Sequence, residues 1–224
     1  MRRSESGWTL VLPVKGGRRA KSRLGGAAYL APAIALDTLE AVLGCPEVAT
    51  AVVVTADPAI SGQATALGAR VRRERNPGAG LDAAVRQGLT GLAGPVGVLL
   101  ADLPALRPDD LSQALHAVSI ALEPARADAP VRIGAEPPRW VVVPDAEGTG
   151  TVLLAGTADA IRPSFGPASA AAHVRLGAMR LDLSAPRLRR DVDTPADLEQ
   201  AVRLGVGRNV AAALAAPHTV VRLP

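Results

Sequence analysis

The sequence predicts an α/β domain in which a mostly parallel sheet carries helices on both faces. Short runs rich in Val, Leu and Thr alternate with segments of helical periodicity through the first half of the chain. Helical segments between strands are typical of parallel strands joined by crossover connections. The 224 residues are 48% hydrophobic but only 2% aromatic, so the core must consist mainly of Ala, Val and Leu.

The first half of the chain divides into four strand–helix pairs. We expect strands where apolar or β-branched runs stop at turn residues or charges. The strands cover Thr9–Val14, Thr50–Thr55, Arg70–Arg73 and Val96–Leu100, and the helices cover Leu30–Leu43, Asp57–Leu67, Leu81–Leu92 and Asp109–Leu122. Because ligands of such sheets bind outside the carboxyl ends of the strands, residues just after each strand are candidates for a functional site.

The second half departs from this rhythm and predicts a small β insertion. Residues 123–138 are rich in Pro, Ala and charge, which is typical of a surface excursion. Strands are expected at Trp140–Val143, Val152–Leu154 and Met179–Leu183, a short helix ends at Val174–Gly177, a last helix covers Asp197–Leu204, and the alanine-rich tail ends in a strand-like TVVRL. No internal repeat is visible, so the chain is interpreted as one domain, residues 1–224.

Charge and cysteine content narrow the class of protein. The net charge is only +4 although the isoelectric point is about 10.1, and aromatic platforms for stacking bases are missing. Neither a nucleic-acid partner nor a membrane is expected. The single cysteine, Cys45, allows no intrachain disulfide, and the short N-terminal apolar run does not resemble a signal peptide. The expected location is the cytoplasm.

The first candidate site is a basic loop directly after the first expected strand. The run TLVLPV stops at Lys15, and two glycines and four further cations follow: Arg18, Arg19, Lys21 and Arg23. Glycine lets the backbone approach a ligand closely, and Lys and Arg supply charge and forked donors for phosphate. The pattern favours a polyphosphate ligand such as a nucleotide, and the alternative is a solvated basic turn.

Three carboxylates form the second candidate site. Asp102 directly follows GVLLA, just past the expected strand, where Mg²⁺ could join it to substrate phosphates, or where it could cap a turn. Asp191 and Asp193 alternate in RRDVDTPADL and would share one face of an extended segment. The competing interpretation makes Asp193 or Thr194 the N-cap of the last helix, with Pro195 at its first position.

Three loops complete the candidates. Glu147–Thr151, EGTGT, is either an anion-binding nest of backbone N–H groups or an ordinary hairpin loop. Pro163–His173 opens a helix near Pro167, with Ser169 in its first turn and His173 expected on the helix surface. The loop at Asn76–Leu81, NPGAGL, could read a base or ribose edge through Asn76 and backbone groups, or be a plain turn.

Taken in order, LPVKGGRRAKSRL, NPGAGLDAAV, LLADLPAL, GTGT, FGPASAAAH and RRDVDTPADL resemble the 2-phospho-L-lactate guanylyltransferase family, including its phosphoenolpyruvate-using bacterial branch. The resemblance spans about Leu10 to Gly207. It implies a nucleotidyltransferase fold, which is a Rossmann-like α/β fold shared with molybdenum-cofactor nucleotidyltransferases. Residues 123–138 look longer than in typical members.

The resemblance also implies residue roles. Lys15, Lys21 and Arg23 match the triphosphate-binding loop, and Lys15, Lys21 and Asp102 are the implied catalytic residues. Asn76 and Gly80 lie in the loop implied to bind the nucleotide. Asp102, Asp191 and Asp193 match the metal-binding motifs, and the implied cofactor is Mg²⁺. Thr151, Gly166 and Ser169 match the positions that hold the phosphate of the acid substrate.

The implied reaction transfers GMP from GTP to a phosphorylated three-carbon acid and releases pyrophosphate, as a step of coenzyme F-420 biosynthesis. The composition, rich in Ala, Arg, Pro and Gly, resembles high-GC bacterial members, which favours phosphoenolpyruvate as acceptor and enolpyruvyl-diphospho-5'-guanosine as product. 2-Phospho-L-lactate and 3-phosphoglycerate remain alternatives, as do a molybdenum-cofactor nucleotidyltransferase and a non-enzymatic nucleotide- or nucleic-acid-binding module. The implied partners are GTP, the acid and, for hand-over, the next enzyme of the pathway; the oligomeric state stays open.

Overall fold

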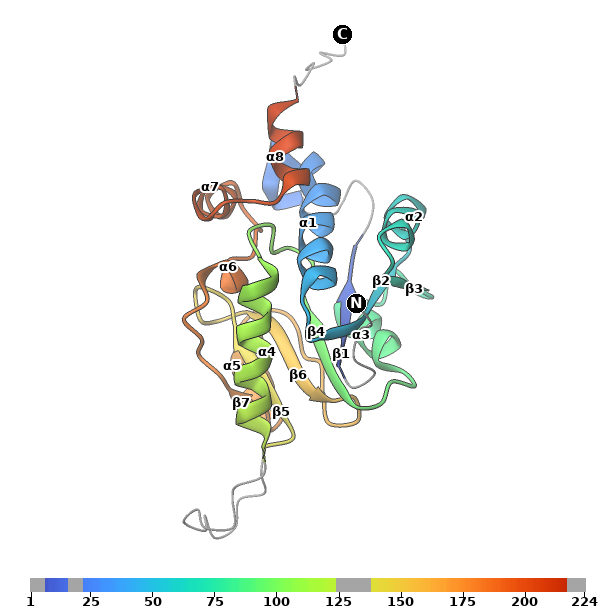
Figure 1. Cartoon of the computed structure of the whole chain (residues 1–224), viewed down its shortest axis with the longest axis vertical. Helices are drawn as coiled ribbons and strands as arrows, with labels where there is room; N and C mark the ends of the chain where they lie inside the picture. Colours follow the sequence, from blue (N-terminus) through green and yellow to red (C-terminus); the bar gives the residue numbers. More distant parts are fainter. Residues whose placement is uncertain (1–6, 16–21, 124–137, 217–224) are drawn as a thin grey trace.

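The computed structural model describes residues 7–15, 22–123 and 138–216, and its centre is one seven-stranded sheet (Figure 1). The strand order is β3-β2-β1-β4-β6-β5-β7. The strands are β1 (Trp8–Pro13), β2 (Val48–Thr55), β3 (Arg70–Arg73), β4 (Pro95–Leu99), β5 (Trp140–Pro144), β6 (Thr151–Thr157) and β7 (Met179–Arg180). The four strands expected in the first half are confirmed, with ends shifted by one or two residues.

The sheet is parallel except for one strand. β1 pairs in parallel with β2 and β4, and β2 pairs in parallel with β3. β6 is antiparallel to both β4 and β5, and β5 is parallel to β7. The expected α/β class is therefore confirmed. The β-rich second half is no separate unit, because its strands extend the same sheet.

Helices cover both faces of this sheet (Figure 1). They are α1 (Ala31–Gly44), α2 (Pro58–Ala66), α3 (Leu81–Leu89), α4 (Pro108–Leu122), α5 (Ser169–Arg175), α6 (Pro186–Arg189), α7 (Pro195–Leu204) and α8 (Arg208–Ala215), with a 3-10 helix, η1 (Ser22–Leu30), before α1. The sequence pattern did not predict η1, α6 or α8. α3 ends earlier than expected because Thr90 and Gly91 leave the helix.

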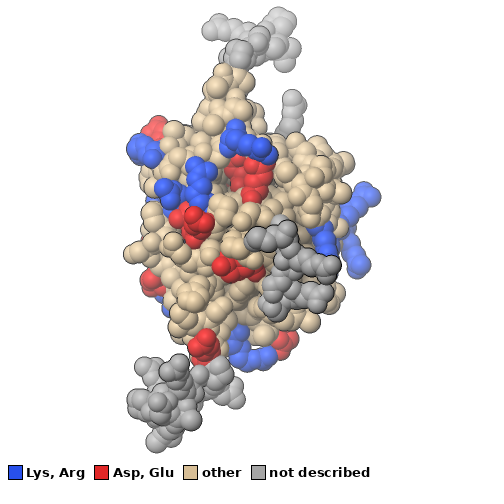
Figure 2. Space-filling view, in the orientation of Figure 1, with Lys and Arg blue, Asp and Glu red and all other residues tan. Residues whose placement is uncertain are grey.

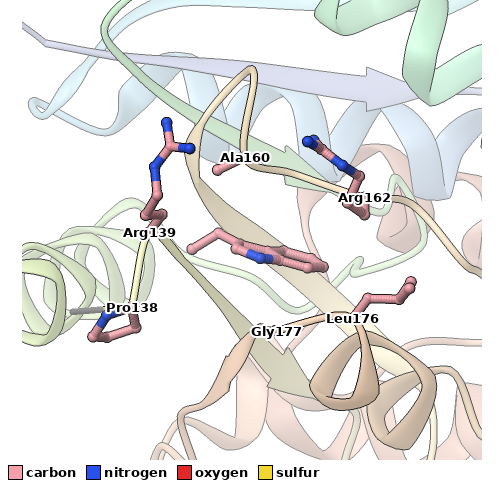
Figure 3. A pocket seen from close by; sticks show the side chains of 7 residues that line it. Pro138, Arg139, Ala160, Arg162, Leu176 and Gly177 are labelled. Atoms are coloured by element: carbon pink, nitrogen blue, oxygen red, sulfur yellow. The ribbon is translucent and has the colours of Figure 1, made fainter. Parts of the chain in front are cut away.

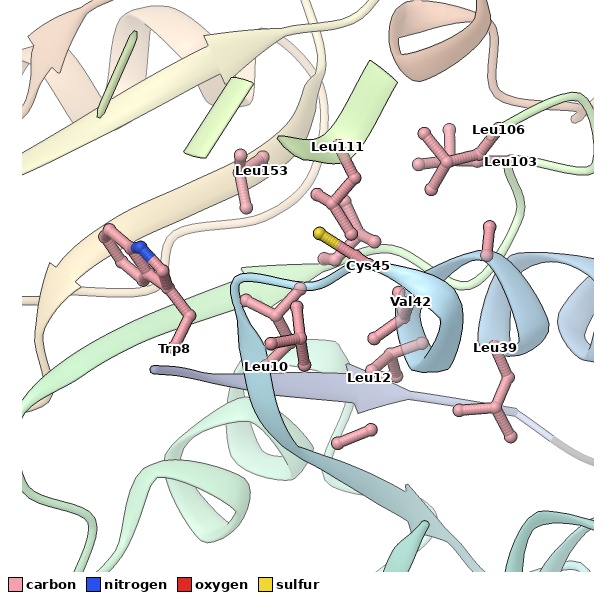
Figure 4. Close-up of a cluster of buried hydrophobic side chains, with 14 of the residues drawn as sticks. Trp8, Leu10, Leu12, Leu39, Val42, Cys45, Leu103, Leu106, Leu111 and Leu153 are labelled. Atoms are coloured by element: carbon pink, nitrogen blue, oxygen red, sulfur yellow. The ribbon is translucent and has the colours of Figure 1, made fainter. Parts of the chain in front are cut away.

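The core on the α1 and α4 side is built by alternate residues of the strands. Leu10 and Leu12 of β1 point into it, while Val11 between them packs on the opposite side. Figure 4 shows Leu10, Leu12, Leu39, Val42 and Leu111 gathered around Cys45. Burial, and next to it the hydrogen bond to Glu47, raise the pKa of the Cys45 thiol to about 12, so this cysteine is an inert part of the core.

The opposite face of the sheet is covered by α3 and α5. Gly88 of α3 lies so close to the sheet that a Cβ there would be 2.3 Å from Cγ1 of Val11, which allows the helix to approach β1 closely. α5 contributes His173, which is fully buried between the rings of Trp140 and Phe165, at 5.9 and 5.1 Å between ring centroids. The expectation that His173 lies on the helix surface is wrong, because α5 turns this face toward the sheet.

A third apolar cluster connects the C-terminal helices to the rest of the fold. It joins Leu24 and Leu30 of η1 to Val192, Leu198 of α7 and Val210 of α8. The buried carboxylate of Asp37 in α1 accepts the N–H groups of Asn209 and Val210 at 2.9 and 3.0 Å, which satisfies the first turn of α8. This contact fixes the docking of the last described helix.

One helical stretch in the described part of the chain, Leu24–Gly44, is long and apolar enough to cross a membrane. It consists of η1 and α1, with a left-handed backbone at Gly25. In α1, Ile34, Leu39 and Val42 are buried against the sheet and the third cluster. Apolar side chains of this stretch therefore pack in the protein core.

We predict a pH-dependent loss of stability that originates at His173. Burial lowers the pKa of His173 to about 4, against a smaller opposing influence of the Asp82 carboxylate. Between pH 6.5 and 4, His173 is protonated in the unfolded chain but neutral in the folded chain. The free energy of unfolding therefore decreases as the pH is lowered through this range, by up to about 3 kcal/mol. Urea unfolding of the wild type and of His173→Gln across this range should show a steeper loss in the wild type.

The matched control is His116→Gln, which removes an exposed histidine of α4 but keeps His173 and should therefore keep the steep loss caused by His173. Parallel profiles for the wild type and His173→Gln would contradict the prediction.

Candidate functional site

The predicted site residues gather at one edge of the sheet. Lys15 follows β1, Asn76 and Gly80 lie between β3 and α3, and Asp102 follows β4, so all four sit at the carboxyl ends of parallel strands. Thr151 begins β6, which runs in the opposite direction and therefore starts at this same edge. The topology thus brings together residues that are far apart in the sequence.

A small cavity at the ends of β1 and β2 is lined by Lys15, Glu74, Gly80 and Leu81, among others. Gly80 has φ +87 and forms the N-cap of α3, a conformation that favours glycine. Burial raises the pKa of the Glu74 carboxyl, and the neighbouring Lys15 acts in the opposite direction. Apart from its place directly after β3, nothing in the sequence pattern indicates a role for Glu74.

Part of the basic loop falls outside the described residues. Lys21 is not described, and neither are Arg18 and Arg19. The backbone of Arg23 lies in η1, but its side chain is not described. The predicted roles of Lys21 and Arg23 therefore remain predictions, and the described part of the loop is Lys15, which is exposed.

The loop that carries Asp102 is held by three segments from distant parts of the chain. The Leu103 N–H donates to Oγ1 of Thr38 in α1 at 3.0 Å, and the Val192 N–H donates to the Asp102 carbonyl at 3.0 Å. The Gly207 N–H donates to the Pro104 carbonyl at 2.8 Å. Oδ1 of Asp102 is buried. The second of these bonds also places the Asp191–Asp193 segment beside Asp102.

The N-cap of α7 is Thr194, not Asp193. Its Oγ1 accepts the Asp197 N–H at 3.3 Å, and the Asp197 carboxylate accepts the Thr194 N–H at 2.8 Å, which completes a capping box. Val192 is buried, whereas Asp191 is half-buried and Asp193 is exposed. The interpretation of this motif as a helix cap is confirmed, with Thr194 and not Asp193 as the cap residue.

Asp191 lies in a group of three carboxylates. Ligand oxygens of Asp145, Glu147 and Asp191 all lie within 4.8 Å of one another, the kind of oxygen-donor set that suits Mg²⁺. Among the described residues, Asp102 and Asp193 are not part of such a group of three. Glu147 also pairs with Arg190 at 2.6 Å. The structure therefore brings Asp191 to Asp145 and Glu147, which the sequence analysis did not single out as metal ligands.

The hairpin loop at Glu147–Thr151 is organised around Asp145. Its Oδ1 accepts the Thr149 N–H at 2.9 Å, and its Oδ2 accepts the Gly150 N–H at 2.8 Å. The alternative of an anion nest in this loop is therefore wrong for these two amides, because a carboxylate of the protein already occupies them. The hairpin interpretation is correct, since β5 and β6 pair antiparallel across the loop.

Thr151 and Ser169 meet in a buried hydrogen-bonded group with His173. The Ser169 hydroxyl donates to Oγ1 of Thr151 at 2.9 Å, and Oγ1 of Thr151 lies 3.0 Å from Nδ1 of His173. The Ser164 N–H donates to Nε2 of His173 at 2.9 Å. Because Nε2 accepts, the neutral ring carries its proton on Nδ1 and donates it to Thr151.

The hydrogen bonds within this group leave one O–H donor available to a ligand. The Nδ1–H of His173 and the Ser169 hydroxyl both donate to Oγ1 of Thr151, and Thr151 keeps a proton of its own. Among the described residues neither hydroxyl has a further acceptor, so one proton of the group remains for an acceptor outside it. The sequence pattern did not indicate a role for His173, because that role depends on a contact with Thr151, 22 residues away.

Gly166 lies on the loop between Ser164 and Ser169. It is exposed and has φ +139, and a Cβ there would meet nothing within 4 Å. Ala168 has φ +54, the only positive φ at a non-glycine residue in the described part of the chain. The Phe165 N–H donates to Oδ1 of Asp82 in α3 at 2.8 Å. The loop is therefore irregular, faces open space and is tied to both α3 and α5.

A larger cavity, of about 290 Å³, lies at the other edge of the sheet, where β5 begins. Figure 3 shows Arg139 and Arg162 on either side of it. Arg139 pairs with Asp159, and Arg162 donates to the carbonyls of Asp159 and Ile161. Because both guanidinium groups have internal partners and no predicted site residue lies there, cavity size does not identify the site.

The face of the molecule in Figure 2 shows Lys and Arg side chains beside Asp and Glu side chains. Among the described residues, ion pairs join Arg208 to Glu40, Arg187 to Asp110, and Arg190 to Asp197. The face seen there has no continuous basic stripe of the kind that tracks a nucleic-acid backbone.

The chain matches the MobA-like NTP transferase domain over residues 16–184. Phosphoenolpyruvate guanylyltransferase of Salinispora arenicola is 48% identical over 212 residues, which cover 91% of this chain and 92% of that protein. Phosphoenolpyruvate guanylyltransferase of Streptomyces scabiei is 44% identical over 224 residues, 93% of this chain and 96% of that protein.

Solved structures share the fold. A nucleotidyl transferase from Methanothermobacter thermautotroptrophicus has a TM-score of 0.63 at 18% identity, covering 88% of this chain and 97% of that one. A CMP:2-keto-3-deoxy-manno-octonic acid synthetase complexed with CTP has a TM-score of 0.53 at 21% identity, covering 89% and 98%. With the sequence similarity extending over nearly the whole chain, we conclude that the protein belongs to the phosphoenolpyruvate guanylyltransferase family and has a MobA-like NTP transferase domain.

Proposed function

We propose that this protein transfers GMP from GTP to phosphoenolpyruvate, with release of pyrophosphate and formation of enolpyruvyl-diphospho-5'-guanosine. The observation that carries the proposal is the 48% identity to a phosphoenolpyruvate guanylyltransferase over nine-tenths of both chains. The site supports it, because nucleotide-side, carboxylate and acceptor-side residues meet at one sheet edge. The expected location is the cytoplasm, and the expected partners are the two substrates and the enzyme that takes over the product.

The chemistry needs no protein nucleophile. An oxygen of the acceptor phosphate bonds to the α-phosphorus of GTP, the bond from that phosphorus to the bridging oxygen breaks, and its electron pair leaves with pyrophosphate. The protein must bring two polyanions together, and two unit charges about 4 Å apart repel by about 4 kcal/mol at an effective dielectric constant near 20. Lys15, Lys21 and Arg23 are the residues we assign to this task.

The carboxylates at the edge fit a divalent cation. Asp102, Asp191 and Asp193 are the proposed Mg²⁺ ligands. Of these, Asp191 lies in the group with Asp145 and Glu147, whose ligand oxygens are within 4.8 Å of one another. A bound Mg²⁺ supplies positive charge to the phosphates. The chain itself contributes the fixed position of Asp102, through the bonds from Thr38 and Val192 to its loop.

Thr151, Gly166 and Ser169 form the proposed subsite for the acceptor phosphate. Two of them are in direct contact, and Gly166 lies on the adjoining loop with open space above it. The proton left over in the Thr151–Ser169–His173 group suits a phosphate oxygen, which only accepts. Asn76 and Gly80, at the other end of the edge, are the proposed contacts of the nucleoside, and the neighbouring Glu74 joins them there.

The first prediction tests the reaction. GTP, Mg²⁺ and phosphoenolpyruvate should give pyrophosphate at a rate at least about tenfold above that with 2-phospho-L-lactate or 3-phosphoglycerate, since a pocket contact separates close analogues by about 1–3 kcal/mol. Release with 2-phospho-L-lactate alone would replace the proposed acceptor. A molybdenum-cofactor role would instead show no release with any of the three acids.

The second prediction concerns Asp102. Asp102→Asn keeps the size of the side chain and the backbone bonds of its loop but removes the charge, so turnover should fall by roughly 100-fold or more while the fold survives. Steady-state kinetics and circular dichroism measure the two effects. Asp109→Asn, at an exposed position in the first turn of α4, is the control. Near-normal turnover of Asp102→Asn would remove Asp102 from the metal site.

The third prediction separates the two substrates. Ser169→Ala should weaken the acceptor by about 1–3 kcal/mol, or roughly 5- to 150-fold, because a hydrogen bond to a charged group is lost. Gly166→Val should raise the KM for the acceptor more than the KM for GTP, because a β-branched residue does not adopt φ +139 and its side chain would enter the open space. If both variants change only the KM for GTP, the substrates have been placed the wrong way round.

A further inference from the structure

Two consecutive backbone N–H groups of the acceptor loop donate to side chains from two different helices. The Ser164 N–H donates to Nε2 of His173 in α5, and the Phe165 N–H donates to Oδ1 of Asp82 in α3. Both distances are short, 2.9 and 2.8 Å. These bonds end directly before Gly166, the residue assigned to the acceptor phosphate.

The loop needs such support because it has no regular structure of its own. Residues 161–168 form neither helix nor strand. Gly166 has φ +139, which glycine adopts without strain, whereas Ala168 has φ +54, a value that a non-glycine residue keeps only where the surroundings impose it. On its C-terminal side the loop is anchored by the Ala170 N–H, which donates to the Thr149 carbonyl at 3.1 Å. On its N-terminal side the two bonds to His173 and Asp82 serve this purpose.

His173 reaches both parts of the acceptor subsite with one ring. Nε2 accepts from the loop at Ser164, and Nδ1 lies 3.0 Å from the Thr151 hydroxyl. The rings of Trp140 and Phe165 pack edge-to-face with the imidazole, at interplanar angles of 81° and 73°, which fixes its orientation. The distance between the Gly166 loop and Thr151 is therefore set by a rigid imidazole.

Asp82 connects the acceptor loop to the nucleotide side. It directly follows Gly80 and Leu81, which line the cavity with Lys15, and its partner Phe165 lies 83 residues further along the chain. A carboxylate that accepts a backbone N–H makes a stronger bond than a neutral group does. Asp82 also stands near the His173 ring, as its influence on that ring's pKa shows.

We propose that Asp82 and His173 are positioning residues that together hold the Ser164–Gly166 backbone in the conformation that receives the acceptor phosphate. This inference rests on the proposed function. Neither side chain is assigned a contact with the substrate. Both act through the loop, so their loss should affect the acceptor and spare GTP.

The experiment compares Asp82→Ala and Asp82→Asn with the wild type, by KM for phosphoenolpyruvate and for GTP. Asp82→Ala should raise the KM for phosphoenolpyruvate at least about tenfold and that for GTP less than about twofold, because a hydrogen bond to a charged group is lost on the acceptor side alone. Asp82→Asn keeps an oxygen that can accept the Phe165 N–H and should restore most of the loss. Asp109→Ala removes an exposed carboxylate from the same position of another helix and should change neither KM.

His173 is tested by two substitutions that divide its functions. His173→Gln retains an acceptor that can reach the Ser164 N–H, and His173→Asn retains a donor at the place of Nδ1. Since His173 is buried, each variant can lose stability, and unfolding is followed in parallel. We expect His173→Gln, which keeps the bond to Ser164, to bind phosphoenolpyruvate more tightly than His173→Asn.

A measurement that needs no turnover tests the positioning roles of Asp82 and His173 independently of the proposed function. Amide hydrogen exchange of the wild type should show protection at Ser164 and Phe165 that is lost at Phe165 in Asp82→Ala and at Ser164 in His173→Asn. If the wild type turns over no acid, the proposed function fails, and the exchange pattern still decides the role of the two residues. Unchanged protection, or equal increases of both KM values in Asp82→Ala, would overturn the inference.

Discussion

The burial of β1 on both faces is the constraint on which the rest of the structure depends. Leu10 and Leu12 pack on the α1 side and Val11 packs on the α3 side, so neither face of the strand can meet water. A strand buried on both sides must pair on both edges, and β2 and β4 do so in parallel. Parallel pairing then forces the carboxyl ends of these strands to one edge. Lys15 and Asp102 become neighbours of one site for this reason.

The single antiparallel strand has a particular consequence for that site. Because β6 reverses direction between β4 and β5, its first residue, Thr151, lies at the edge where its neighbours end. The loop before it is shaped by Asp145, whose carboxylate accepts two amides of the turn. A fully parallel arrangement would have placed Thr151 at the opposite edge. The reversal therefore brings Thr151, which we propose for the acceptor, to the same edge as the residues that we propose for the nucleotide.

Many polar side chains around the site bind the protein itself. Thr38 holds the loop of Asp102, Asp37 holds α8, and Asp82 holds the loop of Gly166. Each accepts backbone N–H groups of another segment, and a backbone group that is buried without a partner costs about 1–3 kcal/mol. The irregular loops of the proposed site are therefore fixed by side chains that need not touch a substrate themselves.

The sequence by itself determined the class of the fold and the order of its strands and helices in the first half. It also placed Lys15 and Asp102, two residues of the proposed site, in loops that follow strands. These depend on local periodicity and on the rule that ligands meet the carboxyl ends of parallel strands.

The tertiary structure decided what depends on contacts between distant residues. It placed Asp191 beside Asp145 and Glu147, made Thr194 the cap of α7, chose the hairpin over the anion nest by binding two loop amides to Asp145, and buried His173 against Thr151. Asp82 and Phe165 are 83 residues apart, and Thr38 and Leu103 are 65 apart. No local pattern encodes such pairs, because a side chain's hydrogen-bond partner is selected only when packing brings the two segments together.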